Sequence, residues 1–203
     1  MTSMQLPIIL ASTSPRRTQL LHQAGVAHDI LSVEIDESWQ DGESATDYIS
    51  RMVNQKADQA IVKLAGNQDC LVITADTIGV LDDGTVLTKP INQADAYRMW
   101  DCLSGATHQI WTAVCVSRML AGVQQREQIC VCTEVDFVPL TESMKQRYWA
   151  TGEPLDKAGA YAIQGGAMAW VSQIRGSYTN VVGLPLAQTV TLIDKMQTDT
   201  TQD

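Results

Sequence analysis

Short apolar runs alternate with amphipathic stretches in the first part of the chain. Residues 8–11 form a buried strand by composition, and the apolar spacing predicts a helix over 14–24 that Gly25 ends. A second short strand is expected around 28–33. Residues 71–75 are apolar throughout, as expected for a strand covered on both faces. This alternation predicts an α/β domain.

The long helix expected after Ser44 carries a charged residue on its apolar face. Ser44 is the expected N-cap, and Asp47 takes the reciprocal capping-box position. The apolar positions form one stripe: Ile49, Met52, Val53, Ala57, Ala60, Ile61 and Leu64. Lys56 falls inside this stripe. Its ammonium either extends to solvent along the helix or enters a cleft at the edge of the core, and we favour the second reading.

The rest of the chain mixes hairpins, helices and loops. The buried strand is expected to end at residues 76–77. After this strand we expect a hairpin of 78–81 with 86–88 and a helix from Asn92 to near Gly105. Paired strands are expected at 107–117 and 127–138, followed by a helix between Thr141 and Gly152. Residues 153–183 are expected to form glycine-rich loops and short strands, and a final helix starts at Pro185. We expect a single domain over residues 1–203 with a mixed sheet and a flexible tail at about 197–203.

Composition narrows the class of protein. A net charge of −9 argues against general nucleic-acid binding, which needs a broad basic surface. No apolar run reaches membrane-spanning length, and the first ten residues do not resemble a signal peptide, so we expect no membrane association and a cytoplasmic location. The five cysteines contain no C-x-x-C pair and are expected as reduced core residues.

The segment Ser12-Thr13-Ser14-Pro15-Arg16-Arg17 follows the first strand and combines several anion-binding groups. Ser14 can cap a helix whose first residue is Pro15, where a missing N–H costs nothing. Unpaired backbone amides, hydroxyls and two guanidinium groups then converge, which favours a phosphate site. The alternative is an ordinary capped helix with two exposed arginines.

Three carboxylates are candidates for chemistry. Asp76 is expected at the carboxyl end of a buried strand, where α/β folds place ligands, and suits a general base or a metal ligand. The alternative role for Asp76 is to cap the following turn. Asp36 and Glu37 lie on an acidic loop and either help to bind Mg²⁺ or are simply solvated.

Lysines in constrained backbone add to the cationic set. Lys89 precedes Pro90, and Lys157 lies in a glycine- and proline-bounded motif. Either is an ordinary solvated lysine when considered alone. Together with Arg16, Arg17 and Lys56, they are five constrained cations out of 14 basic residues, which favours convergence on a polyanion.

Five motifs in order resemble the Maf family of nucleoside triphosphate pyrophosphatases, over about residues 6–190. They are Ser12-Thr13-Ser14-Pro15-Arg16-Arg17, Ala75-Asp76-Thr77, Lys89-Pro90, Ser104-Gly105-x-x-His108 and Gly152-Glu153-Pro154-x-Asp156-Lys157-Ala158-Gly159-Ala160-Tyr161. The resemblance implies hydrolysis of a nucleoside triphosphate to the monophosphate and pyrophosphate with a divalent cation, Mg²⁺ or Mn²⁺. It also implies a fold like that of the inosine triphosphate pyrophosphatases, with two α/β lobes around a central cleft, commonly as a homodimer.

Within that family, the chain is most similar to the branch that acts on dTTP and UTP. The resemblance assigns the proton acceptor to Asp76 and the selection of the base to Arg16, Thr77 and Gln164. The implied phosphate and metal contacts are Ser12, Arg17, Glu37, Lys56, Lys89 and Lys157.

The residue at position 164 distinguishes the branches. A glutamine amide donates to a uracil or thymine carbonyl while accepting from the ring N–H, whereas the glutamate typical of the 7-methyl-GTP branch only accepts. Two rival functions remain open: a nucleotide-binding regulator of cell division that does not cleave its ligand, and a nucleotidyltransferase. Against the transferase, the sequence has no obvious G-x-G-x-x-G or P-loop element.

Overall fold

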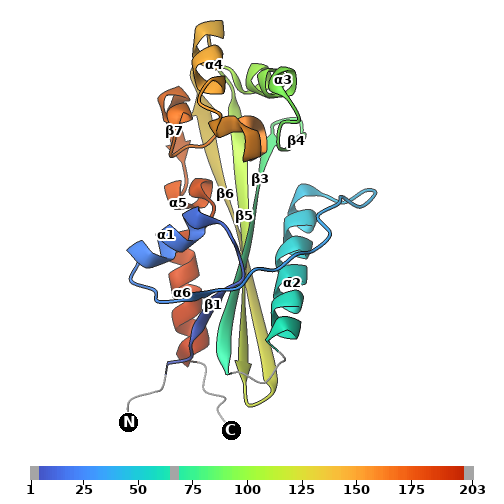
Figure 1. Cartoon of the computed structure of the whole chain (residues 1–203), viewed down its shortest axis with the longest axis vertical. Helices are drawn as coiled ribbons and strands as arrows, with labels where there is room; N and C mark the ends of the chain where they lie inside the picture. The colour runs from blue at the N-terminus through green and yellow to red at the C-terminus, as the bar shows by residue number, and fades with distance from the viewer. Residues whose placement is uncertain (1–4, 65–68, 199–203) are drawn as a thin grey trace. The chain divides into compact units, whose positions relative to one another are not determined.

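A computed structural model describes residues 5–64 and 69–198 (Figure 1). The chain divides into two compact units. The first comprises the described residues within 1–76, 112–130 and 183–203, and the second comprises 77–111 and 131–182. Three strands contribute residues to both units: β3 (Cys70–Leu81), β5 (Thr107–Leu120) and β6 (Val123–Phe137).

The first unit is built around the short strand β1 (Ile8–Leu10). β1 pairs in parallel with β2 (Asp29–Ile30) and with β3, so that Leu10 lies opposite Ile73. The helices of this unit are α1 (Pro15–Gln23), α2 (Ala45–Lys63) and α6 (Leu186–Thr198). In Figure 1 the strands run between α2 on one side and α1 with α6 on the other. Cover on both faces explains why β1 and the first four residues of β3, Cys70–Ile73, are apolar throughout.

Seven strands of the described chain form one mixed sheet, in the order β2-β1-β3-β5-β6-β7, with β4 (Val86–Leu87) attached to β3. β4 and β7 (Val171–Arg175) pair antiparallel with β3 and β6. The expected mixed α/β architecture is therefore confirmed.

The second unit contains most of the short helices. These are α3 (Gln93–Leu103), α4 (Glu142–Trp149), α5 (Tyr178–Val182) and the 3₁₀ turns η1 (Glu153–Asp156), η2 (Ala158–Ala160) and η3 (Gly166–Trp170). Its core is aromatic. Trp100 is fully buried and makes tilted or edge contacts with Tyr97, Tyr148, Trp149 and Trp170.

Several local predictions are confirmed. Ser44 Oγ accepts the Asp47 amide, and the Asn92 side chain accepts the Asp95 amide, as N-caps do. The hairpin of β3 and β4 turns at residues 82–84, where the Gly84 amide donates to the Leu81 carbonyl. β5 and β6 are neighbours in the sheet; β5 continues to Leu120, beyond the expected 117, and β6 begins at Val123, before the expected 127.

Other local predictions were wrong. β3 does not end at Asp76–Thr77 but continues to Leu81, because its second half pairs with β4. Ser14 is the N-cap of α1 but makes no side-chain capping bond. Its amide donates instead to Ser12 Oγ at 3.2 Å. The strand expected over 28–33 is reduced to the two residues of β2.

The cysteine prediction holds only in part. All five cysteines are free thiols, and Cys70 and Cys115 are buried as expected. Cys102 and Cys130 are exposed, because they lie on surface positions of α3 and β6.

Of the tail expected over 197–203, Gln197 and Thr198 complete α6 and the remainder lies outside the described residues. Among the helices of 5–64 and 69–198, none is long and apolar enough to cross a membrane.

Candidate functional site

Two carboxylates of the first unit converge on one ammonium group. Lys56 Nζ lies 2.7 Å from Asp76 Oδ1 and 3.0 Å from Glu37 Oε1. The side chains of Lys56 and Asp76 are only 13% and 17% exposed, whereas that of Glu37 is 55% exposed. The lysine in the apolar stripe of α2 therefore points to acidic partners instead of extending to solvent along the helix; that it enters a cleft stays a prediction.

The approach of α2 to β3 is fixed by a buried hydrogen bond next to this cluster. The Thr74 hydroxyl donates to the Val53 carbonyl at 2.7 Å. Thr74 is two residues before Asp76, and Val53 is three residues before Lys56. Because Thr74 and Val53 are both fully buried, this bond holds the register that places Asp76 opposite Lys56.

Asp76 lies in the middle of β3, and this corrects the expectation that it ends a strand. The parallel pairing of β3 with β1 nevertheless stops at Ile73, opposite Leu10, the last residue of β1. Asp76 therefore lies three residues beyond the carboxyl end of its parallel neighbour. Asp76 thus lies beyond the carboxyl end of β1, and its role as a base or metal ligand stays a prediction.

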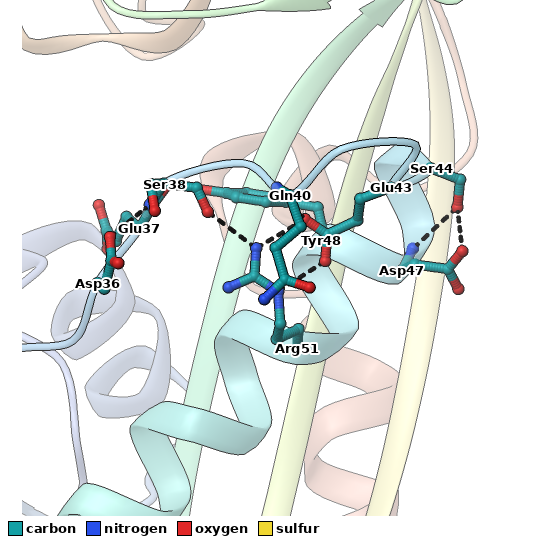
Figure 2. A network of polar contacts seen from close by, with 9 residues as sticks. All are labelled: Asp36, Glu37, Ser38, Gln40, Glu43, Ser44, Asp47, Tyr48 and Arg51. Atoms are coloured by element: carbon teal, nitrogen blue, oxygen red, sulfur yellow. Dashed lines mark hydrogen bonds and ion pairs between the residues drawn. The ribbon is translucent and has the colours of Figure 1, made fainter.

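The loop that carries Glu37 is fastened to α2 by a polar network, shown in Figure 2. Arg51 binds Glu43 through two bonds of 2.6 Å, from Nε to Oε1 and from Nη2 to Oε2. Arg51 Nη2 also donates to the Ser38 carbonyl at 2.9 Å. The Tyr48 hydroxyl donates to the Glu37 carbonyl at 3.0 Å. Two residues of α2 thus hold two consecutive backbone carbonyls of the loop.

Tyr48 is stabilised as a hydrogen-bond donor. Burial raises the pKa of its phenol to about 12, and the negative charges of Asp76 and Glu37 add to the effect. Its ring stacks on Trp39, with centroids 4.0 Å apart and an interplanar angle of 6°. The guanidinium of Arg51 lies 5.5 Å from the centroid of the same ring.

A second group of candidate residues lies at the start of α1. Arg17 Nη1 donates to Ser12 Oγ at 3.2 Å, and its Nε donates to the Gly183 carbonyl at 2.9 Å. Burial lowers the pKa of the Arg17 guanidinium, while the charge of Asp76 opposes that change, and Arg16 reinforces it. A guanidinium remains charged under these conditions. Arg16 and Arg17 therefore concentrate positive charge at the amino end of a nine-residue helix.

The paired carboxylates suit a hard divalent cation. Mg²⁺ is bound in proteins by one or two carboxylates and completes its shell with water and substrate phosphates. Asp76 and Glu37 already direct oxygens at one cationic atom. Within 5–64 and 69–198 there is no cluster of three or more His, Cys, Asp or Glu that could hold a metal, so two carboxylates are what this site offers. The donor set fits the implied cation.

In the second unit, the segments of Lys89 and Lys157 are joined through their neighbours. The Gly159 amide donates to the Thr88 carbonyl at 2.9 Å, and the Ala160 amide donates to the Lys157 carbonyl at 3.0 Å. Gly159 has φ +68°, and a Cβ there would lie 3.2 Å from Leu87 Cδ1. Lys89 is exposed and Lys157 is partly exposed. The two lysine motifs thus belong to one local structure.

His108 and Tyr161, which belong to two different motifs, lie in the core of this unit. His108 is fully buried, and its Nε2 lies 2.7 Å from the Tyr161 hydroxyl. Trp100 Nε1 donates to the Ala160 carbonyl at 3.0 Å. Burial lowers the pKa of His108 to about 4. The Ser104–His108 motif and the end of the Lys157 motif therefore meet inside the unit rather than at a surface.

The remaining candidates are Thr77 and Gln164. Thr77 follows Asp76 in β3 and is partly exposed. Gln164 is exposed and lies on the turn that precedes η3, closed by the Gly165 amide donating to the Ala162 carbonyl at 3.0 Å.

Sequence reasoning missed Tyr48, Arg51 and Glu43. Tyr48 and Arg51 are three positions apart, a spacing that places both on the helix face beside the preceding loop. That spacing is the signal that could have found them. That Arg51 pairs with Glu43, and not with another acidic residue of the loop, depends on the path of the loop in the folded protein.

Comparison with known proteins agrees with the motifs. The family model described as "Maf-like protein" matches residues 7–196. A protein of Psychrobacter cryohalolentis named "dTTP/UTP pyrophosphatase" is 48% identical over 225 residues, covering 96% of this chain and 100% of that protein. One of the same name from Pseudoalteromonas atlantica is 47% identical over 192 residues, covering 93% and 96%.

A solved structure, a nucleoside-triphosphatase / dITP/XTP pyrophosphatase from Mycobacterium abscessus, aligns with 65% of this chain and 74% of that one. Its TM-score of 0.39 and 12% identity are too low to carry an argument. The assignment to a family rests instead on the match to the family model over nearly the whole length of the chain, and on the five motifs in order. This chain belongs to the Maf family.

Proposed function

We propose that this chain hydrolyses dTTP and UTP to the nucleoside monophosphate and pyrophosphate. The observation that carries the proposal is the similarity, over nearly the full length of both chains, to relatives named dTTP/UTP pyrophosphatase. The cluster of Asp76, Lys56 and Glu37 supplies groups suited to this chemistry.

In the proposed reaction, water attacks the α-phosphorus and pyrophosphate leaves. Asp76 accepts the proton of the attacking water, since a carboxylate shielded from bulk solvent and oriented by an ammonium is suited to a general base. Lys56 holds that carboxylate in position and lies where it can also neutralise phosphate charge.

Cations of the first unit stabilise the triphosphate. Arg16 and Arg17 present guanidinium groups at the start of α1, and Ser12 orients Arg17 through its hydroxyl. The amides of the first turn of α1 add donors that face an anion. Their common effect is to stabilise the charge that develops on the leaving pyrophosphate.

Asp76 and Glu37 would hold the divalent cation, Mg²⁺ or Mn²⁺. When bound, the cation supplies neutralisation of phosphate charge and lowers the pKa of a coordinated water. Glu37 is suited to this task because its side chain is exposed while the backbone beneath it is held by Tyr48 and Arg51.

The second unit contributes two kinds of group in this proposal. Lys89 and Lys157 contact phosphate. The family resemblance assigns selection of the base to Arg16, Thr77 and Gln164. The Gln164 amide provides the donor and acceptor pair that uracil and thymine require.

The test is a panel of nucleoside triphosphates with Mg²⁺ or Mn²⁺, in which both pyrophosphate and monophosphate are measured. Equal amounts of the two products from dTTP and UTP support the proposal. Binding without products would favour the non-catalytic regulator, and transfer of the nucleotidyl group to an acceptor other than water would favour a transferase. We further propose that the protein is a homodimer located in the cytoplasm. Light scattering after gel filtration measures the oligomeric state, and cell fractionation measures the location.

A further inference from the structure

The turn that carries Gln164 is fastened at both ends. At its start, the Ala162 amide donates to the Tyr148 hydroxyl at 2.9 Å. At its end, the Gly166 amide donates to Glu153 Oε2 at 2.9 Å. All of these residues belong to the second unit. Gln164 therefore extends from a backbone that two side chains outside the turn hold in place.

The carboxylate of Glu153 fills the space over Gly165. A Cβ at position 165 would lie 1.7 Å from Glu153 Oε1, so the Glu153 carboxylate would have to move. The φ of Gly165 is −111°, so glycine is not required there for a left-handed backbone. Glycine at 165 leaves room for the Glu153 carboxylate, the flexible end of its side chain, which an alanine Cβ would displace.

Glu153 is itself held in place just after the carboxyl end of α4. Its amide donates to Thr151 Oγ1 at 3.2 Å, and the Thr151 hydroxyl donates to the Tyr148 carbonyl at 2.7 Å. A Cβ at Gly166 would lie 2.9 Å from Tyr148 Cδ2, so the turn also rests against the ring of Tyr148. Tyr148 and Glu153 thus form one support, which we call the Gln164 latch.

We propose that Glu153 is a positioning residue for base selectivity, which it controls by holding the Gln164 turn. The proposal rests on the proposed function, in which Gln164 reads the base. An amide offers one donor and one acceptor, and half a rotation exchanges them, so a poorly placed glutamine accommodates cytosine as well as uracil. A fixed turn limits the placements of that amide. Discrimination between UTP and CTP then depends on the latch.

The experiment compares kcat and KM for UTP and CTP in Glu153→Ala, Glu153→Gln and Gly165→Ala. In Glu153→Ala we expect the UTP-to-CTP ratio of kcat/KM to fall about tenfold, with the loss concentrated in KM for UTP. Glu153→Gln restores the ratio, because its amide oxygen still accepts the Gly166 N–H. Gly165→Ala should reproduce the fall in the ratio, because the alanine Cβ displaces the Glu153 carboxylate. This variant tests the proposal if Glu153→Ala does not fold.

Asp83→Ala is the matched control. Asp83 also accepts a backbone amide in a turn of the second unit, that of Thr85 at 2.8 Å, but it lies in the β3–β4 turn. Its removal should leave the ratio within twofold of the wild type. A ratio in both Glu153→Ala and Gly165→Ala that also stays within twofold overturns the proposal.

Gln164→Ala separates this proposal from the function on which it rests. If this variant lowers the ratio, and Glu153→Ala added to it lowers the ratio no further, the latch acts through Gln164. If Gln164→Ala leaves the ratio unchanged while pyrophosphate is still formed, the latch proposal fails and the hydrolysis stands. If the wild type forms no pyrophosphate from any nucleotide, the proposed function fails first.

Discussion

Lys56 Nζ lies 2.7 Å from Oδ1 of Asp76, although the two residues are 20 positions apart and belong to a helix and a strand. The same nitrogen is 3.0 Å from Oε1 of Glu37. One ammonium thus organises both carboxylates that we propose for catalysis and metal binding, and this arrangement gives the first predictions.

Asp76→Asn should fold like the wild type and lose about two or more orders of magnitude in kcat. The amide oxygen still accepts a bond from Lys56, but an amide cannot take a proton from water. Product formation and thermal unfolding measure the two effects. The matched control is Asp58→Asn, which removes a carboxylate paired with Arg126 at 2.7 Å in the same unit. Turnover by Asp76→Asn at the wild-type rate would exclude Asp76 as the base.

Lys56→Met should bind Mn²⁺ more tightly than the wild type when no nucleotide is present. The ammonium lies between the two carboxylates, and removing a unit positive charge about 4 Å from a doubly charged cation raises the affinity by about thirtyfold even in water. Calorimetric titration with Mn²⁺ measures this. Lys63→Met is the control, since Lys63 on the same helix donates to the Ser32 carbonyl. Equal or weaker Mn²⁺ binding by Lys56→Met would show that the carboxylates do not form the metal site.

Arg51→Met should raise the metal concentration needed for half-maximal activity by about tenfold, as loss of a residue that orients a metal ligand does. The variant releases Glu43 and the Ser38 carbonyl and so loosens the loop of Glu37. Activity as a function of Mg²⁺ concentration is the measurement. Arg98→Met, which breaks the pair with Asp95 at 2.8 Å, serves as the control and should leave the metal dependence as in the wild type. A similar curve for both variants would contradict the role of Arg51.

The buried His108 should make the protein less stable toward acid. Because burial lowers its pKa to about 4 in the folded state, the unfolded chain binds one more proton between about pH 6.5 and 4. The free energy of unfolding therefore falls as the pH drops through this window, by up to about 1.4 kcal/mol per pH unit. Urea unfolding at several pH values in His108→Gln should show a shallower slope. His22→Gln, at an exposed position of α1, should keep the wild-type slope.

Much of the local structure could be predicted from sequence, because the interactions that determine it span only a few residues. The caps at Ser44 and Asn92 depend on neighbours three positions away, and the stripe of α2 depends on helical periodicity. The motifs around Asp76 and Lys157 were specific enough to indicate the family that the family model then matched.

The sequence by itself therefore determined the elements, the family and the residue types available for chemistry. Only the tertiary structure decided that Lys56 points to Asp76 rather than to solvent, that β3 continues past Asp76, and which side chains hold the loops of Glu37 and Gln164. The physical reason is that each of these outcomes depends on a partner in another element. Helical periodicity and capping rules carry no information about which distant carboxylate, carbonyl or strand edge will be within reach once the chain has packed.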